Sequence, residues 1–334
     1  MRRKSRTRST PESCSSTFGM LAEGVISESF DIRVVGAVRR YLLIRPDGMD
    51  PATLPTVLDL HGSGSWPAEH AAITAARAFA ALGAIVVVPQ AGIRFRMLAD
   101  WPAGWAWNVP GSPLPGETTP RDEPDDLGFI QALTDRLIDR HGVDPHRIHL
   151  RGFSGGARLA SHLMARMTDQ LASVCCVAGV RFVEPSAGWL PPLLAIHGWL
   201  DAVNPHAGGG GPRWSESVES VISQWAAAIG CGPTPRHRVV SGQIREARYV
   251  DAEGFAAVRL IAVADAEHSW PGTQHGDHIA QFGAPGSWDA SQAHWHFVHE
   301  VERNDIRGTA HGDDRPLRGN VTEGDETTTT APPP

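Results

Sequence analysis

The sequence lacks the features that mark several classes of protein. Its 334 residues contain no apolar stretch long enough to cross a membrane, and no G-x-G-x-x-G or G-x-x-x-x-G-K-[ST] motif for a nucleotide. The four cysteines follow neither a disulfide framework nor a compact zinc pattern. A formal net charge of −7 argues against nucleic acid as the main partner. We therefore expect no membrane segment, no metal, no cofactor and no nucleic-acid partner.

The first ten residues are rich in arginine, but polar residues follow them instead of the apolar segment of a secretory signal. Cys175 and Cys176 lie inside an apolar run, where free buried thiols are common. These observations favour a reduced, cytoplasmic protein, with secretion as the open alternative.

One folded domain is expected over residues 23–302, between tails at 1–22 and 303–334 whose composition cannot bury much apolar surface. Short apolar runs alternate with longer amphipathic ones, which indicates β-α-β units around a mostly parallel sheet with helices on both faces. The strand candidates are 34–44, 56–60, 84–88, 147–150, 173–177, 193–196 and 258–263, and the helix candidates are 68–82, 125–141, 156–167, 215–228 and 290–301.

The segment 91–124 breaks this alternation. It holds Trp101, Trp105 and Trp107 among prolines and glycines, and a loop of that length inside a compact domain is usually functional or disordered. Three large apolar rings argue against disorder. The segment is predicted to be a lid or a substrate wall.

A candidate nucleophile follows the strand at 147–150, in the turn Gly152-Phe153-Ser154-Gly155-Gly156. A strand, this G-x-S-x-G turn and a helix make the context of a nucleophile elbow, in which small neighbours let the backbone pass closely. The helix N-terminus also favours developing negative charge beside Ser154. The alternative is a glycine-rich βα turn without chemistry.

An oxyanion hole is expected from two backbone N–H groups. One belongs to Gly155, directly after the nucleophile, and the other to the turn His61-Gly62-Ser63-Gly64 after the strand at 56–60, where Ser63 is our choice. The alternative for this segment is a plain turn.

An acid and a base follow two further strands. Asp201 comes a few residues after the strand at 193–196, and His268 comes just after the strand at 258–263. The order Ser154, Asp201, His268 is that of α/β-hydrolases, so a Ser-His-Asp triad is predicted. Asp201 could instead cap a turn, and His268 with His275 and His278 could suggest a metal, although the spacing fits no compact site.

The chain resembles the esterase family that joins polyhydroxybutyrate depolymerases, feruloyl esterases and acetylxylan esterases. The resemblance runs from about residue 41 to 301 and is carried by Leu60-His61-Gly62, Val88-Pro89-Gln90, Trp105-Ala106-Trp107-Asn108, Asp125-Asp126-Leu127-Gly128-Phe129-Ile130, Val143-Asp144-Pro145-His146-Arg147-Ile148, the turn around Ser154, Ile196-His197-Gly198 with Asp201, and His268-Ser269-Trp270-Pro271-Gly272. It implies an α/β-hydrolase fold with Ser154 as nucleophile, Asp201 as acid and His268 as base. The sequence departs from the family in Ala266 and Glu267, where glycines are usual, and in the bulky Trp199 and Leu200.

We therefore expect a carboxylic-ester hydrolase that forms an acyl-enzyme on Ser154 and takes a small or polymer-linked ester. Trp105, Trp107, Trp199 and Trp270 are the expected substrate-binding residues, since aromatic rings stack on aromatic or sugar-linked groups. A serine peptidase, a dienelactone-type hydrolase and an inactive binding protein of the same fold are the alternatives. The oligomeric state is left open.

Overall fold

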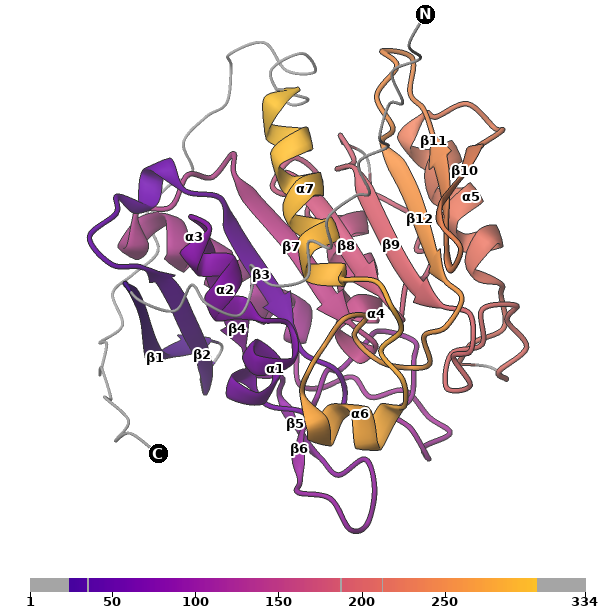
Figure 1. The fold of residues 1–334 in the computed structure, drawn as a ribbon. Helices are drawn as coiled ribbons and strands as arrows, with labels where there is room; N and C mark the ends of the chain where they lie inside the picture. Colours follow the sequence, from indigo (N-terminus) through magenta and orange to yellow (C-terminus); the bar gives the residue numbers. More distant parts are fainter. Residues whose placement is uncertain (1–23, 35, 187, 212, 305–334) are drawn as a thin grey trace, which may run out of the picture.

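The computed structural model describes residues 24–34, 36–186, 188–211 and 213–304. The predicted tail 1–22 and nearly all of the tail 303–334 lie outside the described residues. The centre of the structure is a ten-stranded sheet with the strand order β1-β2-β4-β3-β7-β8-β9-β12-β11-β10 (Figure 1). Its strands are β1 (Val25–Val34), β2 (Ala37–Pro46), β3 (Thr56–Leu60), β4 (Ile85–Pro89), β7 (Ile148–Phe153), β8 (Ser173–Val177), β9 (Leu193–Gly198), β10 (Arg236–Ser241), β11 (Ile244–Tyr249) and β12 (Val258–Val263).

The six central strands, from β4 to β12, run parallel, and an antiparallel pair extends the sheet on each side. Every residue of β3, β4, β7, β8, β9 and β12 is buried. Strands covered on both faces have no solvent side, so they read as continuous apolar runs such as Ile85–Pro89. The predicted mostly parallel sheet is confirmed.

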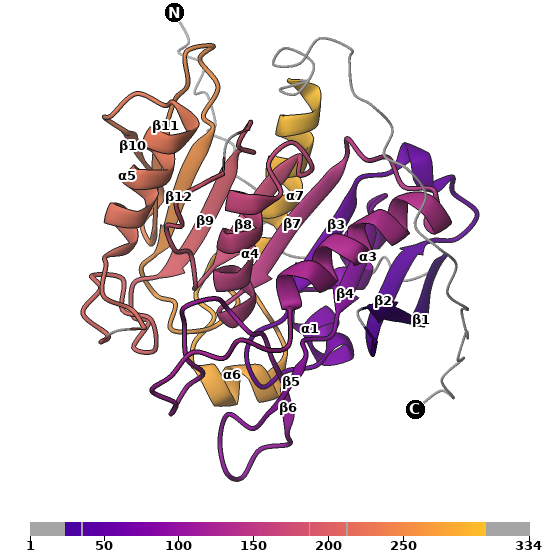
Figure 2. The ribbon, with the colours of Figure 1, turned by 180° about the vertical axis from the view of Figure 1, so that it is seen from behind.

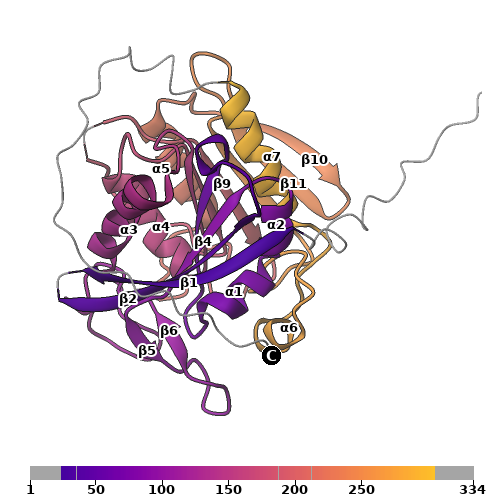
Figure 3. The ribbon, with the colours of Figure 1, turned by 90° about the vertical axis from the view of Figure 1, so that its left-hand side faces the viewer.

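Helices cover both faces of the sheet. Figure 1 shows α1, α2 and α7 in front of it, Figure 2 shows α3, α4 and α5 on the opposite face, and Figure 3 shows the layers from the side. The helices are η1 (Pro51–Thr53), α1 (Pro67–Ile73), α2 (Ala76–Ala81), α3 (Asp126–His141), α4 (Gly155–Arg166), α5 (Val218–Ile229), α6 (Gly276–Phe282) and α7 (Ala290–Arg303). No helix in the described part of the chain is long and apolar enough to span a membrane.

The helix predicted at 125–141 illustrates why the sequence folds this way locally. Asp125 caps α3, because its side chain accepts a hydrogen bond from the backbone N–H of Gly128 at 2.8 Å. Gly142 ends the helix in the left-handed conformation with φ of 68°. Phe129, Leu133 and their neighbours on one face are fully buried against the sheet. The prediction is confirmed to within one residue.

Two predicted elements are wrong in part. The strand expected at 34–44 begins after a turn, since Val34 ends β1 and β2 starts at Ala37. The helix expected at 68–82 is two helices, because Ala75 has a positive φ of 50° that interrupts the α-helical hydrogen bonds.

Other elements carry no signal that the sequence analysis used. They are β1, the hairpin of β10 and β11, the short helix α6, and a two-stranded sheet of β5 (Ile93–Phe95) and β6 (Gly104–Ala106) inside the segment 91–124. Figure 1 shows β5, β6 and α6 beyond the same end of the central strands. That end is the carboxyl edge of the parallel sheet.

Candidate active site

The carboxyl edge of the sheet gathers the residues singled out in the sequence. Ser63 follows β3, Ser154 follows β7, Asp201 follows β9, and His268 follows β12. These strands lie in the order β3-β7-β8-β9-β12 and run parallel, so their carboxyl ends lie at the same edge of the sheet. In open α/β sheets, ligands bind outside the carboxyl ends of the strands.

Ser154 occupies a strained turn between β7 and α4. Its φ of 51° and ψ of −110° lie in a region that residues with a side chain rarely adopt, at a cost on the order of 1–3 kcal/mol. Glycines make the turn possible: a Cβ on Gly156 would collide with the carbonyl of Leu60, and one on Gly152 would lie 2.5 Å from the carbonyl oxygen of Gly156. The backbone N–H of Ser154 donates to the carbonyl of Val177 at 2.9 Å and holds the turn against β8.

Ser154, His268 and Asp201 are joined by hydrogen bonds, and we call them the Ser154–His268–Asp201 series. The Ser154 Oγ lies 2.9 Å from Nε2 of His268, and Nδ1 of His268 lies 2.7 Å from Oδ2 of Asp201. All three residues are at most 3% exposed. A carboxylate at Nδ1 keeps the proton there, which leaves Nε2 as an acceptor facing the serine hydroxyl.

Asp201 is held as an anion by its surroundings. Its Oδ1 accepts hydrogen bonds from the backbone N–H groups of Val203 at 2.9 Å and Asn204 at 2.7 Å, and Nε2 of His197 lies 3.4 Å from Oδ2. Burial by itself would raise the pKa of Asp201, but the contacts with His197 and His268 outweigh it and keep that pKa well below its usual range. The carboxylate is therefore charged at neutral pH and can stabilise a positive imidazole.

Two backbone N–H groups lie beside Ser154. Gly155 is the first residue of α4, where an N–H has no partner within the helix. Ser63 lies against it, since a Cβ built on Gly155 would be 2.5 Å from the Ser63 Oγ and 3.4 Å from the Ser63 nitrogen. The expected oxyanion donors are thus neighbours at the N-terminus of a helix.

The turn that carries Ser63 is supported by His61. Nδ1 of His61 lies 2.8 Å from the carbonyl of Gly62, and its Nε2 accepts the backbone N–H of Ala91 at 3.1 Å. Burial lowers the pKa of His61 to about 3, so the ring is neutral, as an acceptor at Nε2 requires. Nε1 of Trp107 donates to the carbonyl of His61 at 2.7 Å.

The four expected substrate-binding tryptophans fall into two groups. Trp107 and Trp270 are 1% exposed, and Nε1 of Trp270 donates to Ser291 at 3.1 Å, so both rings pack inside the protein. Trp105 is half-buried, with the guanidinium of Arg94 over its ring, while Trp199 is 51% exposed and lies 4.4 Å from the ring of His206. Only Trp105 and Trp199 of the four reach the surface.

Two histidines gained roles that the sequence analysis did not assign. His197 lies beside Asp201, as described above, and its position at the end of a strand before a glycine was the available signal. Nε2 of His278 accepts the backbone N–H of Trp270 at 3.1 Å, and the ring packs against Phe153. The described part of the chain contains no group of three or more potential metal ligands.

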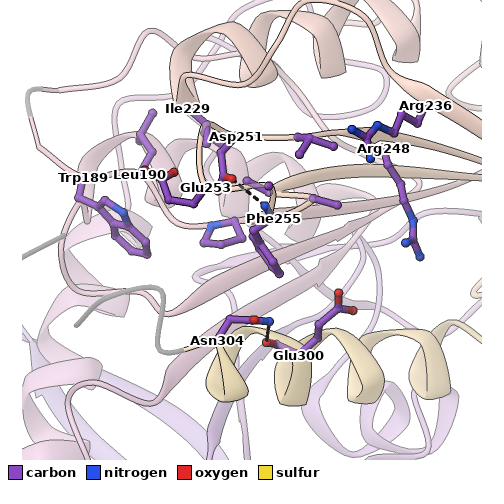
Figure 4. Close-up of a pocket in the computed structure, with 15 residues that line it drawn as sticks. Trp189, Leu190, Ile229, Arg236, Arg248, Asp251, Glu253, Phe255, Glu300 and Asn304 are labelled. Carbon is purple, nitrogen blue, oxygen red and sulfur yellow. Dashed lines mark hydrogen bonds between the residues drawn. The ribbon is translucent and has the colours of Figure 1, made fainter. Parts of the chain in front are cut away.

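A cavity of about 620 Å³ lies at the opposite edge of the sheet. Pro192 and Ala257, which precede β9 and β12, line it together with Trp189, Phe255 and Arg248 (Figure 4). A strand of six residues separates the two edges by about 20 Å. None of the residues singled out in the sequence lines this cavity, so we locate the candidate active site at the carboxyl edge instead.

The fold is that of the α/β-hydrolases. The structure superposes on the acetyl xylan esterase from Aspergillus awamori with a TM-score of 0.51 and 15% sequence identity, over 73% of this chain and 93% of that one. At that identity the likeness concerns the fold alone.

Sequence relatives point in the same direction. The chain is 27% identical to the putative esterase NocK of Nocardia uniformis subsp. tsuyamanensis over 270 residues, 72% of this chain and 73% of that protein. It is 24% identical to feruloyl esterase B of Piromyces equi over 200 residues, 56% of this chain but only 35% of the fungal protein. No family model matches the sequence. The names of both relatives support an esterase.

Proposed function

We propose that the protein is a serine carboxylic-ester hydrolase with Ser154, His268 and Asp201 as its catalytic triad. The observation that carries the proposal is the Ser154–His268–Asp201 series, buried at the carboxyl edge beside the N–H groups of Gly155 and Ser63. The esterase names of the two sequence relatives support the same reaction class.

In this mechanism, Ser154 Oγ attacks the ester carbonyl while Nε2 of His268 takes its proton. The oxyanion that forms accepts hydrogen bonds from the N–H groups of Gly155 and Ser63. The tetrahedral intermediate then collapses, His268 gives its proton to the leaving alcohol, and an acyl-enzyme remains on Ser154. Water, deprotonated by His268, attacks this ester and releases the acid and the free serine.

Within this class, we propose an enzyme like the polyhydroxybutyrate depolymerases and feruloyl esterases. The motifs around Ser154 and His268 and the match to a feruloyl esterase support this narrower proposal. Trp105 and Trp199, the two expected tryptophans at the surface, are the proposed contacts for an aromatic or polymeric group of the ester.

Labelling with a fluorophosphonate probe tests the nucleophile, and a panel of p-nitrophenyl esters tests the reaction. The wild type should be labelled and should hydrolyse the esters, whereas Ser154→Ala should lose both properties, with a fall in kcat on the order of a millionfold. An enzyme that is unlabelled and inactive on every ester would be a binding protein instead. Hydrolysis of a peptide panel or of lactones in preference to open-chain esters would favour the peptidase or dienelactone-type alternative.

A further inference from the structure

Three arginines gather next to the Ser154–His268–Asp201 series, and we call Arg158, Arg181 and Arg213 the arginine cluster. Arg158 lies in α4, Arg181 follows β8, and Arg213 lies in the segment after β9. All three therefore belong to elements that leave the carboxyl edge of the sheet. Burial and mutual repulsion lower the pKa of Arg158 to about 9 and that of Arg181 to about 10, and burial lowers the pKa of Arg213.

Arg158 is the deepest member of the cluster. It lies one turn of α4 beyond Ser154, whose carbonyl accepts its backbone N–H at 3.0 Å. Its side chain is 4% exposed, and both Nε and Nη1 are buried without a hydrogen-bond partner. Unpaired buried charge is unfavourable by several kcal/mol, so buried guanidinium groups in proteins normally meet an anion.

The described residues form no ion pair with the three guanidinium groups of the cluster. Glu216 attracts Arg181 only at longer range, and Nε and Nη1 of Arg158 are buried without a partner. Asp201 acts on Arg158 only at longer range, because its two oxygens are already occupied by His268 and by backbone N–H groups. A local excess of positive charge therefore remains in a protein whose net charge is negative.

The cluster is held in place by neutral contacts. The guanidinium of Arg181 lies 4.4 Å from the ring centroid of Trp214, and Nε of Arg213 donates to the carbonyl of Pro113 at 2.9 Å. Trp214 stacks on His197, which in turn lies beside Asp201. Pro113 belongs to the segment 91–124, so the cluster lies between that segment and the candidate active site.

We propose that the arginine cluster binds a carboxylate of the ester substrate, which makes the preferred substrates esters that carry a free acid group. Guanidinium groups match a carboxylate because they offer several N–H donors in a planar fork. The proposal rests on the esterase function proposed above and narrows its substrate class. The carboxylate could belong to the acyl part or to the alcohol part of the ester, and the test separates the two.

Two matched pairs of esters test the proposal. Mono-4-nitrophenyl glutarate against 4-nitrophenyl pentanoate places the charge on the acyl part, and 4-carboxyphenyl butyrate against phenyl butyrate places it on the alcohol part. For at least one pair, the ratio of kcat/KM for the acidic ester to that for the neutral one should be about tenfold to hundredfold, as a charge-assisted hydrogen bond provides. Arg181→Gln and Arg213→Gln, both at half-buried positions, should bring this ratio towards one.

Arg166→Gln is the matched control, because Arg166 lies at the exposed far end of α4 and should leave the ratio unchanged. A wild-type ratio near or below one in both pairs, or a high ratio that survives in both cluster variants, would overturn the proposal. Failure to hydrolyse any of the four esters, acidic or neutral, would instead overturn the proposed function, and this inference with it.

Discussion

The two edges of the parallel sheet both carry hydrogen-bonded polar side chains, fully buried at the carboxyl edge and mostly half-buried at the amino edge, and these side chains have different partners. At the carboxyl edge, Ser154, His268 and Asp201 bond to one another through atoms that can exchange a proton. At the amino edge, Arg147 pairs with Glu302, and Arg259 pairs with Glu300. These two pairs attach the C-terminal turn of α7 to the starts of β7 and β12.

The backbone also differs between the two edges of the sheet. The carboxyl edge contains the strained Ser154 and glycines whose Cβ would collide with neighbouring backbone, whereas the amino edge holds an open cavity and ordinary two-pronged ion pairs. Strain persists only where the surrounding structure enforces it. The comparison teaches that the tightly constrained edge is the one suited to chemistry, and that the other edge mainly contributes stability.

After the loss of Ser154 itself, the largest effect should come from replacing Asp201 at the carboxyl edge. Asp201→Asn keeps the acceptor for Val203 and Asn204 but removes the charge that orients His268, so kcat for a neutral ester should fall about ten-thousandfold. The thermal unfolding midpoint should change by only a few degrees. Activity within tenfold of the wild type would contradict the assigned role.

The next effect concerns the packing of the elbow. Gly156→Ala should destabilise the protein by about 2–3 kcal/mol, because the new methyl group collides with the carbonyl of Leu60. Gly232→Ala, near the amino-edge cavity, is the control: its Cβ would have only one neighbour, at 3.8 Å, and the change should stay within about 0.5 kcal/mol. Chemical denaturation measures both, and equal losses would remove the contrast in packing between the two edges.

An effect that is smaller when counted per pH unit is expected from His278 at the carboxyl edge. Burial lowers its pKa from the ordinary 6.5 to about 3, so the unfolded state binds the proton more readily between these values. Stability should therefore fall as the pH drops from about 6.5 towards 3, by roughly 1.4 kcal/mol per pH unit for this residue. His278→Gln should flatten that slope in unfolding experiments, whereas His237→Gln, at an exposed position of β10, should not. If the free energy of unfolding depended on pH in the same way in the wild type and in His278→Gln, the prediction would be wrong.

The smallest effect belongs to the amino edge. Burial by itself would raise the pKa of Glu302, but the contacts with His149 and Arg147 outweigh burial and lower that pKa to about 2. A lowered carboxyl pKa contributes stability above the ordinary value near 4.5, and this contribution is lost as the pH falls towards 2. Glu302→Gln should thus lower the free energy of unfolding by up to about 1 kcal/mol at pH 7 and by less at pH 3, with kcat/KM unchanged. An altered kcat/KM would mean that the two edges are not independent.

Most of the central sheet could be predicted from the sequence, because strands buried on both faces are continuous apolar runs. The outer hairpin could not: β10 is exposed along nearly its whole length and shows no alternation of apolar residues. The break between α1 and α2 was also missed, since Ala75 is not a residue type that signals a positive φ. In each case the tertiary environment, which the sequence pattern does not contain, decided the local structure.

The residues of the candidate site likewise fall into some that the sequence predicts and others that it does not. Ser154, Asp201 and His268 could be placed at one edge because each follows a parallel strand, and that rule needs no side-chain detail. Arg158 gave no signal, because a single arginine on a helix is ordinary until the segments that carry Arg181 and Arg213 fold against it. The burial of Trp107 also gave no signal in the sequence, because it follows from tertiary packing that brings its indole N–H to the backbone carbonyl of His61.

The segment 91–124 is joined to the turn that carries Ser63. Trp105 exchanges backbone hydrogen bonds with Gly64 and Ser65 at 2.8 and 2.9 Å, while Trp107 holds the carbonyl of His61. Under the proposed function, the ester contact at Trp105 and the turn that stabilises the oxyanion therefore belong to one hydrogen-bonded unit. A mutation near Trp105 that admits a new substrate should also shift turnover, so substrate range and rate are expected to evolve together in this enzyme.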